Sequence, residues 1–443
     1  MAKKKQIELT IEEKLRNALV PKEEQLYKIP SNWCWTYIHN IAIVVTGKTP
    51  SKKNKEYYGG KFPFFKPADL DAGRNMQYAT EYLSEKGKSI SVIIPEKSTG
   101  ICCIGTIGKC GYFLVEGTTN QQINTVISKI NPLYSYYFFN TNSFVRELIS
   151  KASATTIAIV NKSKLESCLF PVAPLNEQQR IVNRIESLFA KLDRAKELIE
   201  NTLAQFEQNK MAILHKAFTG ELTAKWRKEN NIDLSSWKKC ELKEVFKVVK
   251  DKYNPQTENQ IVNYIGLENI ETSKGIISKN NSSEVKSIKT KFKKDDVLYG
   301  KLRPYLNKHD VVNFDGICST DILVFRFNDI NTAKYINYYF NLPMFIQYAV
   351  ENSSGINLPR VSEKTISKYK ISLPTIEEQQ EIVNILDKLL AKYNKIKNLE
   401  QQLEKIELLK KAILAKAFRG ELGTNNPDEE SAENLLKEIL AEK

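Results

Sequence analysis

The feature that most constrains this 443-residue chain is an internal duplication with a period near 200 residues. The segment 177–183 (EQQRIVN) recurs as 378–384 (EQQEIVN) at an offset of 201. The segment 212–222 (AILHKAFTGEL) recurs as 412–422 (AILAKAFRGEL) at an offset of 200. Because self-similarity at a fixed period indicates one structural unit built more than once, the sequence predicts a fold with an internal pseudo-two-fold repeat.

A weaker match extends each copy toward its N-terminal side. Trp33 lies opposite Trp237, which places one copy from about Trp33 to Leu222 and the other from about Trp237 to Leu422. Between these marks, residues 40–155 and 245–355 share little beyond pattern. We therefore expect a repeated scaffold that carries two different lobes.

The repeated segments predict long helices. Pro174 and Pro374 precede them, and Gly220 and Gly420 stand where a C-terminal glycine ends a helix. The spacings of Asn176 with Gln179 and of Thr375 with Glu378 match capping boxes. Apolar residues then follow at alternating steps of four and three, which is a heptad pattern; in the first copy these are Ile181, Ile185, Leu188, Leu192, Ala195 and Ile199.

Each helix spans about 42 residues, or roughly 63 Å at 1.5 Å per residue. Two apolar stripes in one chain most simply pack on each other, which predicts an antiparallel coiled coil between two lobes. The expected domains are an N-terminal segment with the first lobe (1–172), a central helix (173–222), a second lobe (223–373), a C-terminal helix (374–422) and a tail with a short helix (423–443).

The lobes have the pattern of a mixed α/β (α+β) fold. Short β-branched and aromatic runs separated by Gly, Pro and Asn predict strands, at 41–45, 91–94, 101–104, 123–127, 296–299 and 322–327. Helical patterns follow at 134–150 and 333–351. Two terminal amphipathic stretches, one capped by Thr10 and Glu13 and one preceded by Ser431, are expected to dock on the body or on a partner.

The charge balance favours a polyanionic partner. Lysine and arginine exceed aspartate and glutamate by 14, and the sequence pI is about 9.1. Six lysines stand against one glutamate in 48–66, where aromatic residues are interleaved, and eight basic residues stand against three aspartates in 285–310. A solvated surface explains one such window, but one window in each lobe favours two DNA contacts, with lysines on phosphates.

Polar residues in turns are the candidates for reading bases. In the second lobe the turn 300–305 presents Arg303, which could bond guanine bidentately. The corresponding turn of the first lobe is 105–109, and 118–122 follows it, where Asn or Gln could read adenine. Turn formation explains Gly105, Gly108 and Pro304 equally well. The full set of DNA-binding candidates is Lys48, Thr49, Ser51, Lys52, Lys53, Lys109, Asn120, Gln121, Gln122, Lys301, Arg303, Tyr305, Lys308 and Arg360.

Catalytic and metal-binding patterns are weak. The segment 42–49 fits a relaxed phosphate-loop pattern, but the β-branched residues 43–45 and Pro50 disfavour the required flexible loop and helix. The three histidines lie in different segments, which suggests neither a zinc cluster nor a catalytic triad. The seven cysteines are scattered and are expected to be reduced core thiols, among them Cys102, Cys103 and Cys110. We therefore expect no catalytic residue, no metal and no cofactor on this chain.

The chain is expected to be cytoplasmic. Its apolar runs are far shorter than the roughly 20 residues that span a bilayer, and the N-terminal segment lacks the apolar region of a signal peptide.

The order of lobe, long helix ending in KAFxGEL, lobe and equivalent helix resembles the DNA-specificity subunit of Type I restriction-modification systems. Further marks of the resemblance are the segments 29–33 (IPSNW) and 47–51 (GKTPS), together with the helix starts 174–179 (PLNEQQ) and 374–380 (PTIEEQQ). The resemblance covers essentially the whole chain. The second lobe lacks a clear counterpart of 47–51, so no role needed in both lobes can be assigned to that segment.

The resemblance implies a non-catalytic protein whose two target-recognition domains each read one half of a split DNA sequence. It also implies a spacer set by the helices, two methyltransferase subunits and two restriction subunits that act as DNA translocases. A DNA-modifying or DNA-cleaving enzyme with an unrecognised site is the alternative, and a structural adaptor without DNA contact is a second one. Catalysis by the purified chain would establish the former, and binding without sequence preference would favour the latter.

Overall fold

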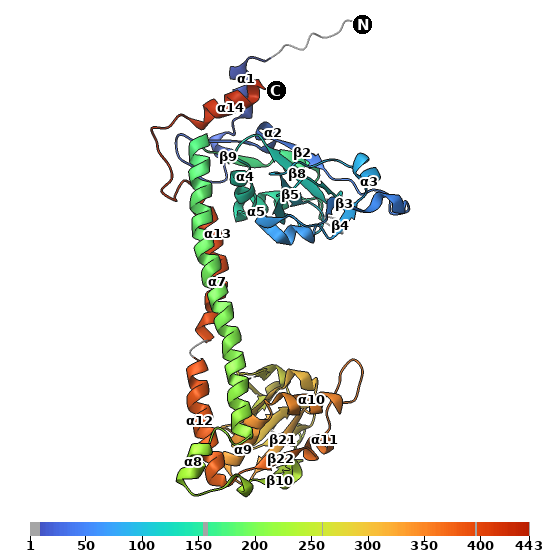
Figure 1. The fold of residues 1–443 in the computed structure, drawn as a ribbon, viewed down its shortest axis with the longest axis vertical. Helices are drawn as coiled ribbons and strands as arrows, with labels where there is room; N and C mark the ends of the chain where they lie inside the picture. The colour runs from blue at the N-terminus through green and yellow to red at the C-terminus, as the bar shows by residue number, and fades with distance from the viewer. Residues whose placement is uncertain (1–8, 154–157, 259, 395–396, 443) are drawn as a thin grey trace. The chain divides into compact units, whose positions relative to one another are not determined.

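The computed structural model describes residues 9–153, 158–258, 260–394 and 397–442 (Figure 1). The chain divides into two compact units. Unit 1 contains residues 1–198 and 401–443, and unit 2 contains residues 199–400. Helix α7 (Leu175–Phe218) therefore contributes its first half to unit 1 and its second half to unit 2.

Each unit contains a four-stranded antiparallel sheet of the same topology. In unit 1 the order is β2-β8-β5-β6, and in unit 2 it is β11-β21-β18-β19. The strands are β2 (Ala42–Thr46), β5 (Thr99–Cys102), β6 (Cys110–Tyr112) and β8 (Ile123–Ser128), and β11 (Phe246–Val248), β18 (Val297–Gly300), β19 (His309–Val311) and β21 (Ile322–Phe327). The repeat therefore includes the lobes, where the two sequences share only a pattern.

The elements around this sheet also correspond. The pair β1 (Cys34–Tyr37) and β9 (Leu169–Val172) matches the pair β10 (Lys238–Glu241) and β22 (Lys370–Leu373), both antiparallel. The two expected helical stretches are each divided in two, because Thr141 caps a new helix in unit 1 and Pro343 begins one in unit 2. The helices are α4 (Pro132–Phe139), α5 (Asn142–Ser150) and α6 (Lys162–Glu166), and α9 (Ile330–Tyr339), α10 (Pro343–Glu351) and α11 (Glu363–Ser367).

The second sheet differs between the units. Unit 1 has three strands in the order β4-β3-β7, and unit 2 has five in the order β12-β17-β20-β13-β16. These strands are β3 (Tyr58–Phe65), β4 (Glu81–Leu83) and β7 (Thr118–Thr119), and β12 (Lys252–Tyr253), β13 (Asn263–Ile265), β16 (Asn280–Asn281), β17 (Lys289–Phe292) and β20 (Gly316–Cys318). In unit 2 the strand β17 carries Lys289 and Lys291 of the lysine-rich window, whereas in unit 1 most lysines of the window 48–66 precede β3, in the connection from β2.

The expected strand at 91–94 is wrong. The described backbone there forms only an isolated bridge between Ile94 and Gly117, beyond the short helix α3 (Glu85–Ser89). Ile94 is buried and Ile93 is exposed. The β-branched run therefore contributes one anchor to the core, which a pattern of apolar residues alone does not distinguish from a strand.

The long helices begin and end close to the expected positions. After Pro174 and Pro374, α7 starts at Leu175 and α12 (Ile376–Asn394) at Ile376; α13 (Lys397–Ala417) follows, and residues 395–396 lie outside the described part. Gly220 and Gly420 have positive φ of 83° and 74°, as a C-terminal glycine requires.

The capping boxes expected at these helix starts are wrong. Asn176 already lies inside α7, and the Gln179 side chain donates to Asn183 instead. Thr375 does accept from the Glu378 amide at 3.5 Å, but the Glu378 carboxylate is bonded elsewhere. The Glu378 carboxylate therefore accepts from Thr223 and Trp237 instead of accepting from the Thr375 amide, as a capping box requires.

Within each unit, α7 packs against part of the second long-helix segment. In unit 1, Lys196 pairs with Glu407 and Asp193 with Lys410, so the sequence runs in opposite directions along the two helices. In unit 2, Leu214 and Ala217 share a core with residues of α12, among them Ile382 and Leu386. The ion pairs of unit 1 therefore have the expected antiparallel direction, and a coiled coil along the full length of the helices stays a prediction.

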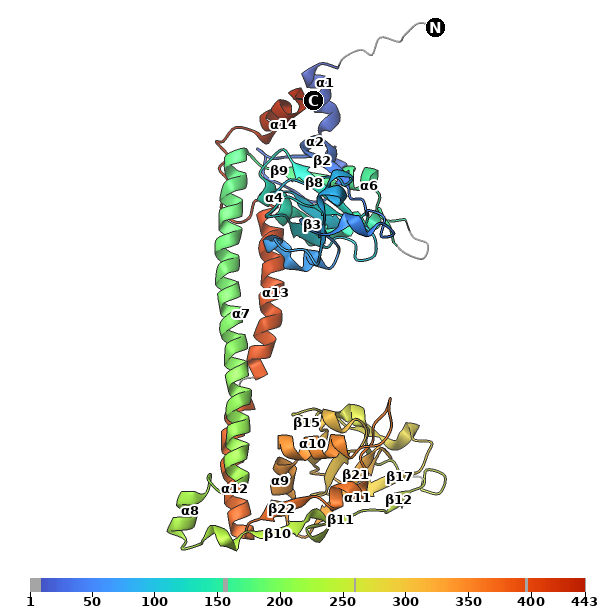
Figure 2. The same ribbon diagram turned by 45° about the vertical axis from the view of Figure 1, so that its right-hand side comes forward.

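Both terminal helices belong to unit 1. Helix α1 (Ile11–Ala18) has the expected capping box between Thr10 and Glu13, and α14 (Ala432–Ala441) follows Ser431. Figures 1 and 2 show α1 and α14 side by side, and Glu12 pairs with Lys437. Their apolar faces join the core of the first lobe, so the docking expected for both stretches occurs within unit 1.

Candidate nucleic-acid interface

Three loops converge at one end of the four-stranded sheet in unit 2. The turn after β18 donates from the Lys301 amide to the Asp321 carbonyl at 2.9 Å and from the Arg303 amide to the Pro359 carbonyl at 2.7 Å. The Val361 amide donates to the Lys301 carbonyl at 3.0 Å. These bonds join the turn 301–307, the loop 318–321 before β21 and the segment 353–361 after α10, which together we call the three-loop cluster.

Unit 1 contains the same cluster. The Cys103 amide donates to the Gln122 carbonyl at 2.8 Å, the Val160 amide to the Cys103 carbonyl at 2.9 Å and the Gly105 amide to the Ala158 carbonyl at 3.5 Å. Gly105 therefore occupies the position of Arg303. The correspondence predicted between the turns 105–109 and 300–305 is confirmed by this shared bonding pattern.

The backbone conformation distinguishes Arg303 from an ordinary turn residue. Its φ is 52° and its ψ 66°, in the left-handed region, where Gly105 of unit 1 has φ of 84°. A side chain in this region carries a backbone cost. The Pro359 carbonyl holds the Arg303 amide, and the guanidinium is exposed. Unit 2 therefore keeps an arginine where the local backbone favours glycine.

The other candidates of unit 2 divide by their contacts. Lys301 is partly exposed and Tyr305 is 53% exposed, so both side chains lie at the surface near Arg303. Lys308 donates to the Leu267 carbonyl at 2.7 Å, and Arg360 pairs with Asp321 at 3.0 Å. The latter two side chains therefore fasten the cluster to its surroundings.

In unit 1 the loop after β2 packs on the cluster. Gly47 approaches Thr119 so closely that an added Cβ would lie 2.2 Å from the Thr119 hydroxyl, and the Lys48 amide donates to the Thr119 carbonyl at 2.9 Å. Thr49 donates to the Gln121 side chain. No helix follows directly in this described stretch, which continues to a 3-10 turn at Lys55–Tyr57, so it does not form a phosphate loop.

The side chains of this loop are mainly open to solvent. Lys48, Ser51, Lys52 and Lys53 are exposed, and Gln121 is exposed beside them. The interleaved aromatics behave differently, because Phe62, Phe64 and Phe65 of β3 are buried core residues. The lysines therefore form most of the accessible surface of this window, with Tyr57 and Tyr58 half-buried beside them.

Three remaining candidates of unit 1 have intramolecular partners. Asn120 is buried, donates to Gln122 at 3.0 Å and accepts from the Gln122 amide at 3.2 Å. Lys109 pairs with Asp71 at 2.7 Å. Of the residues expected to read bases in unit 1, Gln121 is thus the one with an exposed side chain.

A buried glutamate in each repeated motif receives the indole of the matched tryptophan. The Trp33 indole donates to Glu177 at 2.8 Å in unit 1, and the Trp237 indole donates to Glu378 at 2.9 Å in unit 2. Both glutamates have fully buried side chains. Sequence reasoning identified the tryptophans and the EQQ motifs separately, and their nearly equal offsets of 204 and 201 were the signal that could have joined them.

The segment that follows a long helix completes each glutamate site. Thr223, after α7, donates to Glu378 at 2.6 Å, and Thr424, after α13, donates to Glu177 at 3.4 Å. Each site therefore joins the start of a lobe, the start of one long helix and the end of another.

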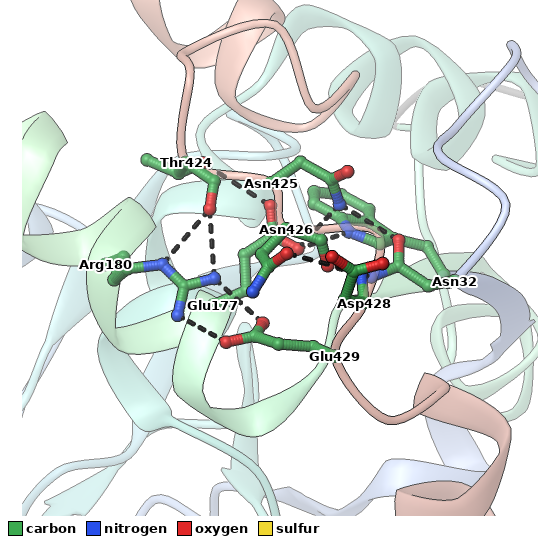
Figure 3. A network of polar contacts seen from close by, with 9 residues as sticks. Asn32, Glu177, Arg180, Thr424, Asn425, Asn426, Asp428 and Glu429 are labelled. Carbon is green, nitrogen blue, oxygen red and sulfur yellow. Dashed lines mark hydrogen bonds and ion pairs between the residues drawn. The ribbon is translucent and has the colours of Figure 1, made fainter.

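The two sites balance the buried charge differently. Arg227, on the short helix α8 (Ala224–Glu229), is buried and pairs with Glu378. In unit 1 the neutral Asn425 donates to Glu177 at 2.9 Å, while Arg180 forms a bidentate pair with Glu429 (Figure 3). Burial raises the pKa of Glu177, and the hydrogen bonds from Arg180 lower the pKa of Glu429.

The histidines and cysteines take structural positions. His215 is exposed on α7, as expected. His309 is buried beside Asn307 and Asn337, and burial lowers its pKa to about 4, so the ring is neutral at pH 7. Cys102, Cys103 and Cys110 are buried, as expected of core thiols, and burial raises the pKa of Cys103 to about 11. His309 and the three cysteines therefore contribute to packing.

Comparison with known proteins agrees with this architecture. The family model described as the Type I restriction modification DNA specificity domain matches residues 30–205 and again 235–408. The specificity subunit of the Type I restriction enzyme EcoDI of Escherichia coli is 25% identical over 94% of this chain and 96% of its own length. The EcoKI specificity subunit of Escherichia coli K12 is 26% identical over the same shares.

Solved structures show the same fold. A chain from a structure on the assembly and conformational transition of a Type I restriction-modification system has a TM-score of 0.68 and 18% identity, covering 89% of this chain and all of its own. The HsdS subunit of Thermoanaerobacter tengcongensis has a TM-score of 0.54 and 18% identity, covering 89% and 98%.

The duplicated scaffold, together with the family-model match to each copy, defines a two-lobed protein of the DNA-specificity class. The chain belongs to the family of Type I restriction-modification DNA specificity subunits. Proteins of this class are non-catalytic recognition subunits, so this chain is not an enzyme. Across the described residues, none of the helices combines the length and the apolar character needed to cross a membrane.

Proposed function

We propose that the chain reads a bipartite DNA target, with each lobe recognising one half-site. The observation that carries this proposal is the presence of the same three-loop cluster on the same four-stranded sheet in both units, with different side chains in each. Gly105 and Gln121 belong to one cluster, and Arg303 and Tyr305 to the other. Two domains that recognise different DNA sequences can share one backbone arrangement but need different side chains at the positions that contact bases.

Direct base contacts are assigned to the exposed members of the clusters. Arg303 has a free fork of donors that matches the O6 and N7 acceptors of guanine. Gln121 can bond an adenine edge bidentately. The exposed lysines 48, 52 and 53 are assigned to phosphates, which fix the position of the protein without reading sequence.

Two identical partner subunits would each need an equivalent binding surface on this chain. The first turns of α7 and α12 present such a pair of surfaces. Leu175, Gln179 and Asn183 are exposed and lie four residues apart on one face of α7. Ile376, Gln380 and Asn384 are exposed at the same positions of α12.

Exposed neighbours of these triplets have diverged between the copies, for example Asn176 to Glu377 and Ser187 to Lys388. Gln179 bonds Asn183 in unit 1, but Leu175 and Ile376 are 55% and 50% exposed apolar side chains at equivalent positions. We assign these triplets to two methyltransferase subunits, through which two restriction subunits join a cytoplasmic complex.

The recruitment is tested by changing one copy at a time. Leu175→Asp and Ile376→Asp should each lower the number of methyltransferase subunits per chain from two to one, and the double variant should retain none, as measured by native mass spectrometry. The control is Ser187→Lys, which changes an exposed neighbouring position to the residue type that the other copy carries there. Retention of both subunits by the double variant would rule out these surfaces.

The bipartite reading is tested by mapping methylated adenine across the host genome with and without the gene. The expected result is one split motif that disappears with the gene. Exchanging the unit 1 cluster for that of another family member should change one half of the motif and leave the other half and the spacer intact. A change in both halves would contradict the assignment of one lobe to one half-site.

A further inference from the structure

The segment after α10 in unit 2 carries an exposed apolar tip. Ile356 is fully exposed and Leu358 is 45% exposed, in the loop that projects beside α10 in Figure 1. The loop has a defined base, because the Ser354 amide donates to the Arg360 carbonyl at 2.9 Å and the Arg360 amide donates back at 2.8 Å. Gly355, with φ of 102°, allows the turn at the tip.

This hairpin is attached to the turn that carries Arg303. The Pro359 carbonyl accepts from the Arg303 amide at 2.7 Å, and the backbone of Leu302 pairs with that of Arg360 in an antiparallel bridge. The ion pair of Arg360 with Asp321 ties the base of the hairpin to the third loop of the cluster. The base of the hairpin is therefore bonded to the turn that carries Arg303, and the tip belongs to the same three-loop cluster.

The surroundings favour duplex DNA as the occupant of this tip. Lys301 and Arg303 lie in the adjoining turn, and within the described residues neither forms an ion pair with an acidic side chain. The turn belongs to the lobe whose window 285–310 holds eight basic residues against three acidic ones. The two cationic side chains are complementary to the phosphates along a DNA groove, and the apolar tip beside them can contact the apolar groups inside that groove.

We propose that Ile356 reads the C5-methyl group of a thymine in the half-site bound by unit 2. An aliphatic side chain offers no hydrogen bond, and in the major groove the thymine methyl is the base feature that an apolar side chain recognises. Arg303 is assigned to guanine in the same groove, and the hairpin that carries Ile356 is bonded through Pro359 and Arg360 to the turn that carries Arg303. The thymine therefore lies within a base pair or two of the position that Arg303 reads. This inference rests on the function proposed above.

The test measures coupling between one side chain and one methyl group. Equilibrium binding of the full chain is measured on target duplexes in which single thymines of the second half-site are replaced by deoxyuridine, which lacks only the methyl. For the wild type, one replacement should weaken binding about fourfold, the equivalent of one buried methyl or methylene group at about 0.8 kcal/mol. For Ile356→Ala, the same replacement should have no further effect.

Ile261→Ala provides a matched control, because Ile261 is also an exposed isoleucine of unit 2 at 72%. That variant should keep the wild-type response to deoxyuridine. An equal response of the wild type and Ile356→Ala at every thymine overturns the inference, as does loss of methyltransferase retention by Ile356→Ala, which would make the tip a protein contact. Absence of any sequence preference in the wild type would instead refute the proposed function itself.

Discussion

The ion pair between Arg227 and Glu378 is buried, so the loss of one partner alone should strongly destabilise unit 2. The Glu378 side chain is fully buried, and Arg227 is 7% exposed. The carboxylate also accepts from Thr223 and Trp237, while the guanidinium donates to the Gly220 carbonyl. Removing one partner of a buried pair leaves an uncompensated charge, at a cost of about 3 to 5 kcal/mol.

We therefore expect Arg227→Met to lower the stability of unit 2 by about 3 to 5 kcal/mol. Hydrogen exchange monitored by mass spectrometry can localise the loss, because amides of α12 should lose protection while those of the first lobe keep it. Arg180→Met in unit 1 is the matched control. Its pair with Glu429 is partly exposed, at 39% and 18%, and should contribute about 1 kcal/mol or less.

The double variant Arg227→Met with Glu378→Gln separates charge from packing. With the carboxylate neutralised, most of the loss should be recovered, since the penalty comes from an unpaired buried charge. Equal destabilisation by the single and the double change would show that the packing of the arginine stem matters instead. A loss below about 1 kcal/mol for Arg227→Met would show that water compensates Glu378, and would refute the reasoning.

Three other predictions follow from the geometry. Burial raises the pKa of Glu177 in the folded chain, so the stabilising contribution of this residue is present at low pH and is lost as pH rises through the raised pKa. Urea unfolding should show the wild type losing stability relative to Glu177→Gln from about pH 4 upward. A difference between the two proteins that does not change with pH would contradict this prediction. Arg303→Ala should cost about 1 to 3 kcal/mol and relax one position of one half-site, whereas replacing Lys52, Lys53 and Lys55 should weaken binding to all sequences and reduce the salt dependence, as titrations on matched and mismatched duplexes can show. Inserting one heptad near residue 200 should lengthen the helix by about 10.5 Å. The unread spacer between the half-sites should then grow by about three base pairs. Methylation mapping that returned altered half-sites with an unchanged spacer would show that the helices do not set the spacer length.

Sequence patterns predicted the elements whose signals are local. The prolines before α7 and α12 and the glycines after α7 and α13 identified helix ends because each residue type restricts the backbone directly. The run 41–45 predicted a strand correctly, which is the edge strand β2, but the equally β-branched run 91–94 did not form one. Pairing depends on a neighbouring strand that the local pattern does not contain.

The candidate site was predictable in outline and not in detail. The turn with Arg303 and its counterpart with Gly105 could be aligned from their positions after equivalent strands. The burial of Asn120 and the bonding of Arg360 to Asp321 could not, because both depend on loops distant in sequence. The hairpin tip at Ile356 escaped prediction for the same reason, since an isoleucine is usually assigned to a core.

The way unit 1 is assembled has a consequence for synthesis on the ribosome. Unit 2 comes from one uninterrupted stretch, whereas unit 1 needs residues 401–443 beside residues 1–198. Glu177 lacks Asn425, and the first lobe lacks Leu414 and Phe418, until some 200 further residues have been added. At 5 to 20 residues per second this wait lasts roughly 10 to 40 s. During that interval the nascent first lobe presents the apolar surface that α13 and α14 later cover, which makes it a substrate for chaperones, and a chain cut short before residue 401 would present that surface permanently to the cell's proteases.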